Sequence, residues 1–204
     1  MIKVTHKMGQ AQSKRILKMN STELEFEFHD RYSAMIWNPQ LLNDSTVKAL
    51  KAEFFFNIIF SVFRDKNHSN KKVSESATEL LSKLNKDITA IHDDFHVKLR
   101  EINFCISECP FTVTFNNNEA INVILKTENN SGVCPDNAIF LKTFLLFDQL
   151  VSALGKARSI SLITDKDYFT QRKNAQSTIR NLMEMFNIEV KRFHASKKVK
   201  IHNN

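Results

Sequence analysis

The sequence predicts an α+β fold that is mostly helical, in the order β-β-α-α followed by a second β-β-α-α. Apolar residues recur at steps of three and four along several long segments, which is the spacing of helices with one buried face. A few short segments alternate apolar and polar residues, as strands with one buried face do. Only three glycines and three prolines occur in 204 residues, which disfavours folds that need many tight turns.

Residues 23–104 are expected to form the first unit, after a flexible basic arm at residues 1–22. The first strand is predicted at residues 23–28, where a leucine and two phenylalanines alternate with three glutamates. A second extended segment is predicted at residues 32–37, and it ends before a proline.

Two helices are predicted to complete this unit. The first is capped by Asp44 or Ser45 and runs to about Arg64, and the second is capped by Ser74 and runs to about Phe104. The apolar stripe of the second helix is regular enough for an intermolecular coiled-coil seam. Packing on the chain's own helices is the favoured interpretation.

Residues 105–186 are expected to form the second unit, a hairpin followed by two helices. The segments FTVTF at 111–115 and INVILKTE at 121–128 flank a polar linker of hairpin length. This hairpin is the best strand signal in the sequence.

The two helices of the second unit follow a loop around Pro135. The first is predicted from Asp136 to about Arg158. The second begins at a capping box formed by Thr164 and Asp167 and ends near residue 186, so that residues 187–204 form a basic tail.

The positive charge of the chain is concentrated in its two ends. The whole chain carries +7, whereas residues 1–22 hold five basic residues without an acid and residues 187–204 hold five basic residues against Glu189. Basic ends on a near-neutral body are typical of proteins that hold a polyanion, although solubilising tails have the same composition. The phosphate-binding candidates are Lys14, Arg15, Lys18, Lys191, Arg192, Lys197, Lys198 and Lys200.

Motifs of catalytic and cofactor sites are absent from the sequence. It contains neither a glycine-rich phosphate loop nor a GxSxG elbow, so we expect a protein that is not an enzyme, with no cofactor and no small-molecule substrate. A metal site can be imagined from His92 and His96, spaced i and i+4, with Cys105 and Cys109. Their spacing matches no standard zinc finger, and histidines beside an apolar helix stripe explain the pair better.

The sequence shows no membrane segment. The longest apolar runs, 54–60 and 138–147, are too short to span a bilayer, and residues 1–15 lack the apolar core of a secretory signal. Three cysteines are an odd number for a chain of this length, which does not indicate a disulfide framework. We therefore expect a cytoplasmic protein.

The strand predicted at 121–128 is also a candidate DNA-reading element. A strand followed by two helices is the order of small β-ribbon DNA-binding proteins, in which strands from two subunits form a ribbon that enters the major groove. Side chains alternate along a strand, so the odd-numbered residues would pack on the helices and the even-numbered ones would face the bases. An ordinary hairpin with a polar outer face fits the same pattern. The base-reading candidates are Asn122, Ile124 and Lys126.

Residues 147–182 carry three further features: Phe147-Asp148-x-Leu150 at the opening, Leu162-Ile163-Thr164 in the turn and Ile179-Arg180-x-Leu182 at the close. With these features, the stretch resembles the C-terminal region of AcaB-type transcriptional regulators of conjugative plasmids and integrating elements. Ser161 stands where we expect a glycine before the turn. The resemblance implies a dimeric activator of transfer genes with an extended ribbon-helix-helix fold, and it implies no catalytic residue.

These observations predict a homodimeric, sequence-specific DNA-binding transcriptional regulator, and the resemblance implies that it activates conjugative transfer genes. The 121–128 ribbon would read the major groove of double-stranded DNA, and the basic ends would hold phosphates. Arg172, Lys173 and Arg180 of the last helix offer another basic face. The alternative is a helical protein–protein adaptor of a mobile element or phage, with the 77–102 stripe as its interface and solubilising tails.

Overall fold

The computed structural model describes residues 3–6, 22–42, 50–110, 120–127 and 133–202. The chain is mostly helical with a small antiparallel sheet, so the predicted α+β class is confirmed. In chain order the elements are β1 (Lys3–His6), β2 (Thr22–Phe28), α1 (Arg31–Trp37), the short 3-10 helix η1 (Pro39–Leu42), α2 (Ala52–Asp65), α3 (Lys71–Ser107), β3 (Ile121–Thr127), α4 (Pro135–Ser159) and α5 (Asp165–His202).

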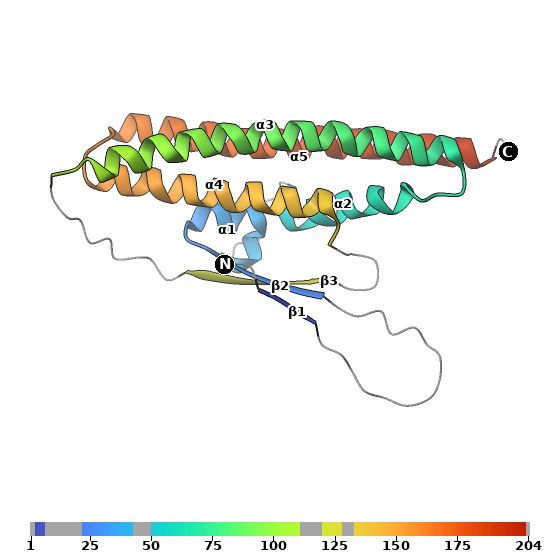
Figure 1. Ribbon diagram of the computed structural model, residues 1–204, viewed down its shortest axis with the longest axis horizontal. Helices are drawn as coiled ribbons and strands as arrows, with labels where there is room; N and C mark the ends of the chain where they lie inside the picture. The colour runs from blue at the N-terminus through green and yellow to red at the C-terminus, as the bar shows by residue number, and fades with distance from the viewer. Residues whose placement is uncertain (1–2, 7–21, 43–49, 111–119, 128–132, 203–204) are drawn as a thin grey trace, which may run out of the picture.

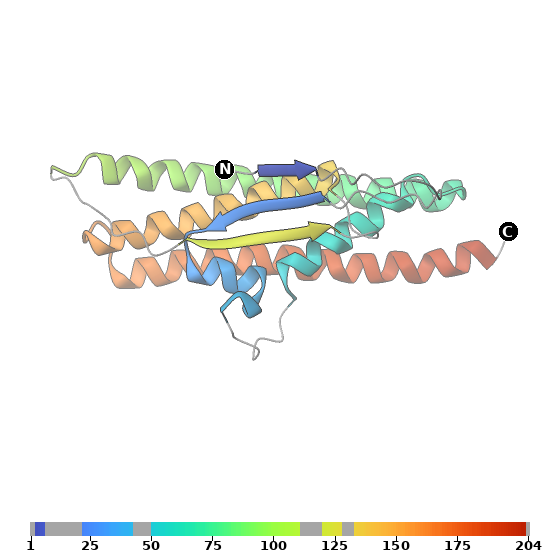
Figure 2. The ribbon, with the colours of Figure 1, turned by 90° about the horizontal axis from the view of Figure 1, so that it is seen from below.

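The helices cover one face of the sheet in two layers (Figure 1). The long helices α3 and α5 form the outer layer, and α4 with α2 lies between them and the sheet. The view turned by 90° shows the three strands side by side in front of the helices (Figure 2). The sheet therefore has one face packed on helices and one face turned away from them.

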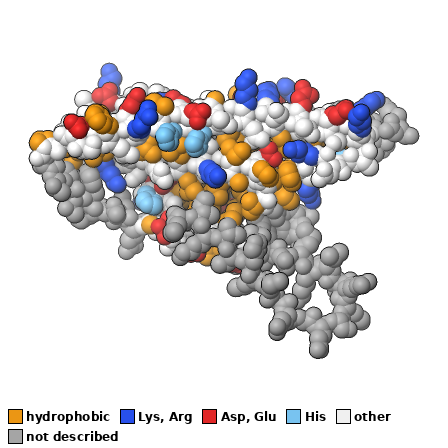
Figure 3. Space-filling view, in the orientation of Figure 1, with side chains coloured by type: hydrophobic (Ala, Val, Ile, Leu, Met, Phe, Trp, Pro, Cys, Tyr) orange, Lys and Arg blue, Asp and Glu red, His pale blue; other side chains and the backbone are white. Residues whose placement is uncertain are grey.

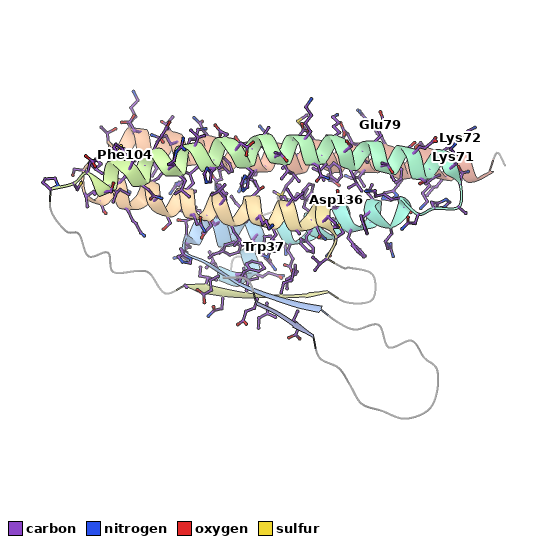
Figure 4. All side chains as sticks on the ribbon, viewed as in Figure 1. Trp37, Lys71, Lys72, Glu79, Phe104 and Asp136 are labelled. Carbon is purple, nitrogen blue, oxygen red and sulfur yellow. The ribbon has the colours of Figure 1, made fainter. Side chains whose placement is uncertain are left out.

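Aromatic rings fill the space between the sheet and the helices. The ring of Trp37 lies 5.1 Å from that of Phe26 and 5.3 Å from that of Phe144, and Phe28 lies 5.6 Å from Phe144. All four side chains are buried, and Trp37 is labelled between the sheet and the helical layers in Figure 4. Burial stabilises the fold by about 2 kcal/mol for each such side chain, so this cluster fixes the sheet on α1 and α4.

The sheet has the order β1-β2-β3, and both strand pairs are antiparallel. In the register of β2 and β3, Glu27 is opposite Asn122 and Glu25 is opposite Ile124. The predicted hairpin partner at 111–115 lies outside the described residues. The described partner of β3 is β2, which is far away in the sequence.

The prediction of an extended segment at residues 32–37 is wrong, because these residues form helix α1. Asp30 caps this helix: its Oδ2 accepts hydrogen bonds from the backbone N–H groups of Tyr32 and Ser33 at 2.7 and 3.0 Å. The aromatic and branched residues of this segment favour a strand locally, but the cap and the burial of Trp37 select the helix.

Helix α3 begins earlier than predicted, because Asn70 and not Ser74 is its N-cap. The side-chain oxygen of Asn70 accepts hydrogen bonds from the backbone N–H groups of Lys72 and Val73 at 3.0 and 3.4 Å. The hydroxyl of Ser74 instead donates to the backbone carbonyl of Lys66. This bond closes the turn between α2 and α3.

The apolar stripe of α3 packs on α4 and α5 of the same chain, as the favoured interpretation predicted. Five of its members are buried against these helices, whereas Ile91, Leu99 and Ile102 are half-buried. Most of the 77–102 stripe, the interface of the adaptor alternative, is therefore used for packing within the molecule. The buried residues are Ala77, Leu81, Leu84, Ile88 and Phe95.

Helix α4 is the central helix of the core. By length and composition it is apolar enough to cross a membrane, but 61% of its most apolar window is buried inside the molecule. The rings of Phe140, Phe144 and Phe147 are all fully buried. This burial is typical of a core helix of a soluble protein.

The turn between α4 and α5 closes with Ser161 in the left-handed region, at φ 59°. The backbone N–H of Leu162 donates to the carbonyl of Ala157 at 2.9 Å, and that of Ser161 donates to Arg158 at 2.9 Å. These two bonds form a Schellman motif, in which a glycine usually occupies the position of Ser161. The expectation of a glycine before the turn thus has a physical reason, because the backbone of Ser161 adopts the left-handed conformation that glycine favours.

Helix α5 begins where predicted and ends later. The backbone N–H of Asp167 donates to the hydroxyl of Thr164 at 3.1 Å, which confirms the predicted cap. The predicted end near Phe186 is wrong, because Val190 and Phe193 continue the apolar spacing and are buried. The basic segment that begins at residue 187 is therefore helical through residue 202.

A single apolar core crosses the proposed division at residue 104. Strand β2 pairs with β3, and α3 packs on α4 and α5, so the units 23–104 and 105–186 share one core. The predicted cap at Asp44 or Ser45 lies outside the described residues, and α2 begins at Ala52.

Candidate nucleic-acid interface

The side chains of β3 alternate as the DNA-reading hypothesis requires. Val123 and Leu125 are 5% and 4% exposed on the helix-facing side, whereas Ile124 is 57% exposed and Asn122 is also exposed. The side chain of Lys126 lies outside the described residues. The strand, its edge position and its outward residues agree with the hypothesis, and a base-reading role for Asn122, Ile124 and Lys126 stays a prediction.

The neighbouring strand makes this outer face acidic. Asn122, Ile124 and Lys126 are opposite Glu27, Glu25 and Glu23 of β2 in the register, and residues opposite each other project from the same face. Glu25 and Glu27 are exposed. Phosphates that approached this face would meet carboxylates one strand away, so its electrostatics oppose DNA binding.

Basic residues gather at one end of the long axis of the molecule, where α5 terminates (Figure 1). We define the basic end as residues 64–72 and 191–198. It holds eight basic residues and one acid, Asp65, and its formal charge of +7 equals the net charge of the whole chain. The basic residues are Arg64, Lys66, Lys71, Lys72, Lys191, Arg192, Lys197 and Lys198.

The two segments of the basic end come from the α2–α3 turn and from the last turns of α5. Figure 4 labels Lys71 and Lys72 at the start of α3, at the same end of the long axis as the C-terminus of α5. Figure 3 shows Lys and Arg side chains at this end of the helical layers. Of the eight basic side chains, six are exposed and two, Lys66 and Lys197, are partly buried.

One hydrogen bond joins the segments directly. The ammonium of Lys197 donates to Oδ1 of Asp65 at 2.7 Å. The residues are 132 positions apart in the sequence, so this contact brings the end of α5 to the end of α2. The charge of Lys197 is therefore already paired inside the protein, which leaves Lys191 and Arg192 as better phosphate candidates.

A groove of about 400 Å³ runs beside the basic end, between α3 and α5. Its polar lining includes Glu79, Lys83, Glu189 and Arg192. Lys83 forms an ion pair with Glu189, and this contact raises the pKa of Lys83 above its ordinary value. Because the lining carries both acids and bases, it favours neither an anionic nor a cationic ligand. We therefore assign no ligand to this groove.

The other predicted phosphate contacts are divided between described and undescribed parts of the chain. Lys14, Arg15 and Lys18 lie outside the described residues. Lys200 lies in α5, and its side chain is not described. The phosphate contacts predicted from the sequence do not include the basic residues of 64–72, because these lie outside the two basic ends of the chain. The three lysines of the stretch DKNHSNKK were the available signal.

The basic face proposed for the first half of α5 is used partly for packing. The guanidinium of Arg172 lies 3.9 Å from the ring centroid of Tyr32, and it donates to the hydroxyl of Tyr168 at 3.2 Å. Lys173 is exposed and Arg180 is half-buried. Arg172 thus holds α5 against α1, and this face offers fewer available charges than the basic end.

The four residues of the imagined metal site do not come together. His92 and His96 stack with ring centroids 6.4 Å apart on α3, but Cys105 lies nine residues after His96 on the same helix. The rise of an α-helix therefore separates His96 and Cys105 by about 13 Å along the helix axis. Among the described residues, no group of three or more His, Cys, Asp or Glu side chains is placed to hold a metal ion.

The fold is similar to that of a protein of known structure. The crystal structure of selenomethionine-containing AcaB from uropathogenic E. coli aligns with a TM-score of 0.56 and 13% sequence identity, covering 90% of this chain and 83% of that one. At this identity the similarity shows a shared fold alone. No family model matches the chain, and no curated protein matches it by sequence.

Proposed function

We propose that this protein is a transcriptional regulator that binds double-stranded DNA through the phosphates, at its basic end. The observation that carries the proposal is the formal charge of +7 on two contacting segments, residues 64–72 and 191–198. Such a concentration of exposed Lys and Arg side chains neutralises phosphates and releases counterions from DNA. The AcaB-like fold supports the choice of a regulator.

The finer parts of the proposal rest on the resemblance in residues 147–182. In these finer parts, the protein activates conjugative transfer genes, forms a homodimer in the cytoplasm, and acts by binding DNA without catalysing a reaction. Sequence-specific contacts would come from a second surface, because lysine contacts to phosphates position a protein on DNA but do not read the bases. The outer face of β3 is the candidate for that role, and the neighbouring carboxylates of Glu25 and Glu27 would reduce its affinity for DNA.

The experiment is a salt titration of DNA binding with a mixed-sequence duplex. Lys191→Glu/Arg192→Glu should weaken binding, and the slope of log K against log salt should become flatter by about 1 for each phosphate that is no longer neutralised. The matched control is Lys86→Glu/Lys166→Glu, which changes the net charge equally at exposed positions outside the basic end and outside the face of Arg172, Lys173 and Arg180. An equal decrease in affinity for both double variants would contradict a localised interface.

A further inference from the structure

Asp65 is the acidic residue of the basic end, and it is buried there. It is the last residue of α2 and is 9% exposed. Its Oδ1 accepts the hydrogen bond from Lys197, while its Oδ2 is buried without a hydrogen-bond partner among the described atoms. A buried carboxylate that depends on one cation holds that cation firmly, because leaving the charge unpaired is costly.

Lys197 lies near the end of α5, where the Lys197–Asp65 contact can hold the helix end in place. Among the side chains of α5 that the structure describes, Val190 and Phe193 are the last two that are apolar and buried. A helix end without buried apolar contacts frays readily. The Lys197–Asp65 bond therefore ties this end of α5 to the end of α2, beyond the last buried apolar side chain that the structure describes in the helix.

His194 lies one turn before Lys197 and close to the same carboxylate. Burial is the main cause that lowers the pKa of His194, and the nearby charge of Lys197 also lowers it, whereas the carboxylate of Asp65 raises it. The net decrease in pKa favours the neutral form of the imidazole, and the cation that hydrogen-bonds to Asp65 is Lys197.

We propose that Asp65 is a positioning residue for DNA binding, which holds the last turns of α5 against the α2–α3 turn so that two basic segments form one phosphate-binding surface. This inference rests on the proposed function. Removal of an acid from a DNA-binding surface makes the surface more positive and ordinarily strengthens DNA binding. If Asp65 positions the end of α5, its neutralisation should instead weaken DNA binding.

The test compares Asp65→Asn with Glu75→Gln in the salt titration. Both variants remove one acid from this end, but Glu75 is exposed and pairs only loosely with Lys71 at 3.7 Å. We expect Glu75→Gln to bind DNA as tightly as the wild type or more tightly, Asp65→Asn to bind less tightly with a flatter salt slope, and Lys197→Arg to retain binding because it keeps the ion pair.

Hydrogen exchange gives a readout that does not depend on DNA. In Asp65→Asn, the amides of residues 194–198 should lose protection while those of residues 81–95 in α3 keep theirs. Unchanged protection at 194–198, or tighter DNA binding by Asp65→Asn, would overturn the positioning role. If the wild type fails to bind DNA, the proposed function is wrong, and hydrogen exchange still decides whether Asp65 orders the helix end.

Discussion

The carboxylate of Asp148 in α4 accepts hydrogen bonds from the backbone N–H groups of Asp30 and its neighbour His29, at 3.0 and 2.9 Å. Asp30 in turn caps α1. One buried acid therefore holds the corner between β2 and α1 on the central helix. Asp148 belongs to the Phe147-Asp148-x-Leu150 feature on which the resemblance to AcaB-type regulators partly rests, and its role in this structure is architectural.

The first prediction concerns the pH dependence of stability at this corner. Burial raises the pKa of Asp148 above its ordinary value of 3.8, against the opposing effect of the two backbone hydrogen bonds. Burial likewise raises the pKa of Asp30. An acid with a higher pKa in the folded state binds more protons when folded, so stability falls as the pH rises from 3.8 through the folded-state pKa.

Asp148→Asn removes this titration and keeps one acceptor oxygen. We expect its free energy of unfolding, relative to the wild type, to increase as the pH rises through that interval and to become constant above it. Urea denaturation at a series of pH values measures the difference. A difference that stays flat or decreases with pH would show that Asp148 is not destabilised by burial. Asp148→Ala should cost about 3 kcal/mol, because both N–H groups are left without their acceptor.

The second prediction concerns Ser161 and its left-handed backbone. A residue with a Cβ atom is destabilised by about 1 kcal/mol or more in this region, whereas glycine is not. Ser161→Gly should therefore raise the free energy of unfolding by about 0.5–1 kcal/mol. Ser159→Gly is the control: Ser159 is the last residue of α4, and glycine there should destabilise by a similar amount. Stabilisation by both substitutions, or by neither, would contradict the strain at Ser161.

The apolar periodicity of the sequence was sufficient to predict the fold class, α3, α4 and the outward and inward residues of β3. It was insufficient for residues 32–37, because the helix there depends on Asp30 and on Asp148 from a distant part of the chain. The basic end could not be predicted for the same reason. Its two segments meet through Asp65 and Lys197, 132 positions apart, and no local pattern encodes that contact.

The third prediction is that folding requires no metal ion. Because Cys105 lies about 13 Å along α3 from His96, we expect chelators to leave the melting temperature unchanged. A structural zinc ion would contribute strongly to folding, so its removal would be visible as a large decrease. Stoichiometric zinc in protein purified without added metal, together with such a decrease, would show that the four residues find another arrangement.

The last prediction decides whether the outer face of the sheet lies near DNA. Glu25 and Glu27 are exposed on β2, opposite Ile124 and Asn122. If β3 enters the major groove, these carboxylates lie close to phosphates, and Glu25→Gln/Glu27→Gln should strengthen DNA binding and steepen its salt dependence. If DNA is held only at the basic end, the double variant should bind as the wild type does.

Asn122→Ala gives the complementary measurement on the preferred binding site, once a genome-wide binding experiment has identified it. Removal of a base contact should cost about 1–3 kcal/mol there and little on random sequence. Val123→Ala is the control for folding: its side chain is 5% exposed, so the truncation should lower stability by about 0.5–3 kcal/mol. A β-ribbon reader requires both tighter binding by the glutamine variant and weaker binding by Asn122→Ala. If neither appears while Lys191→Glu/Arg192→Glu still weakens binding, DNA recognition lies with the helices, and β3 serves only to close the core.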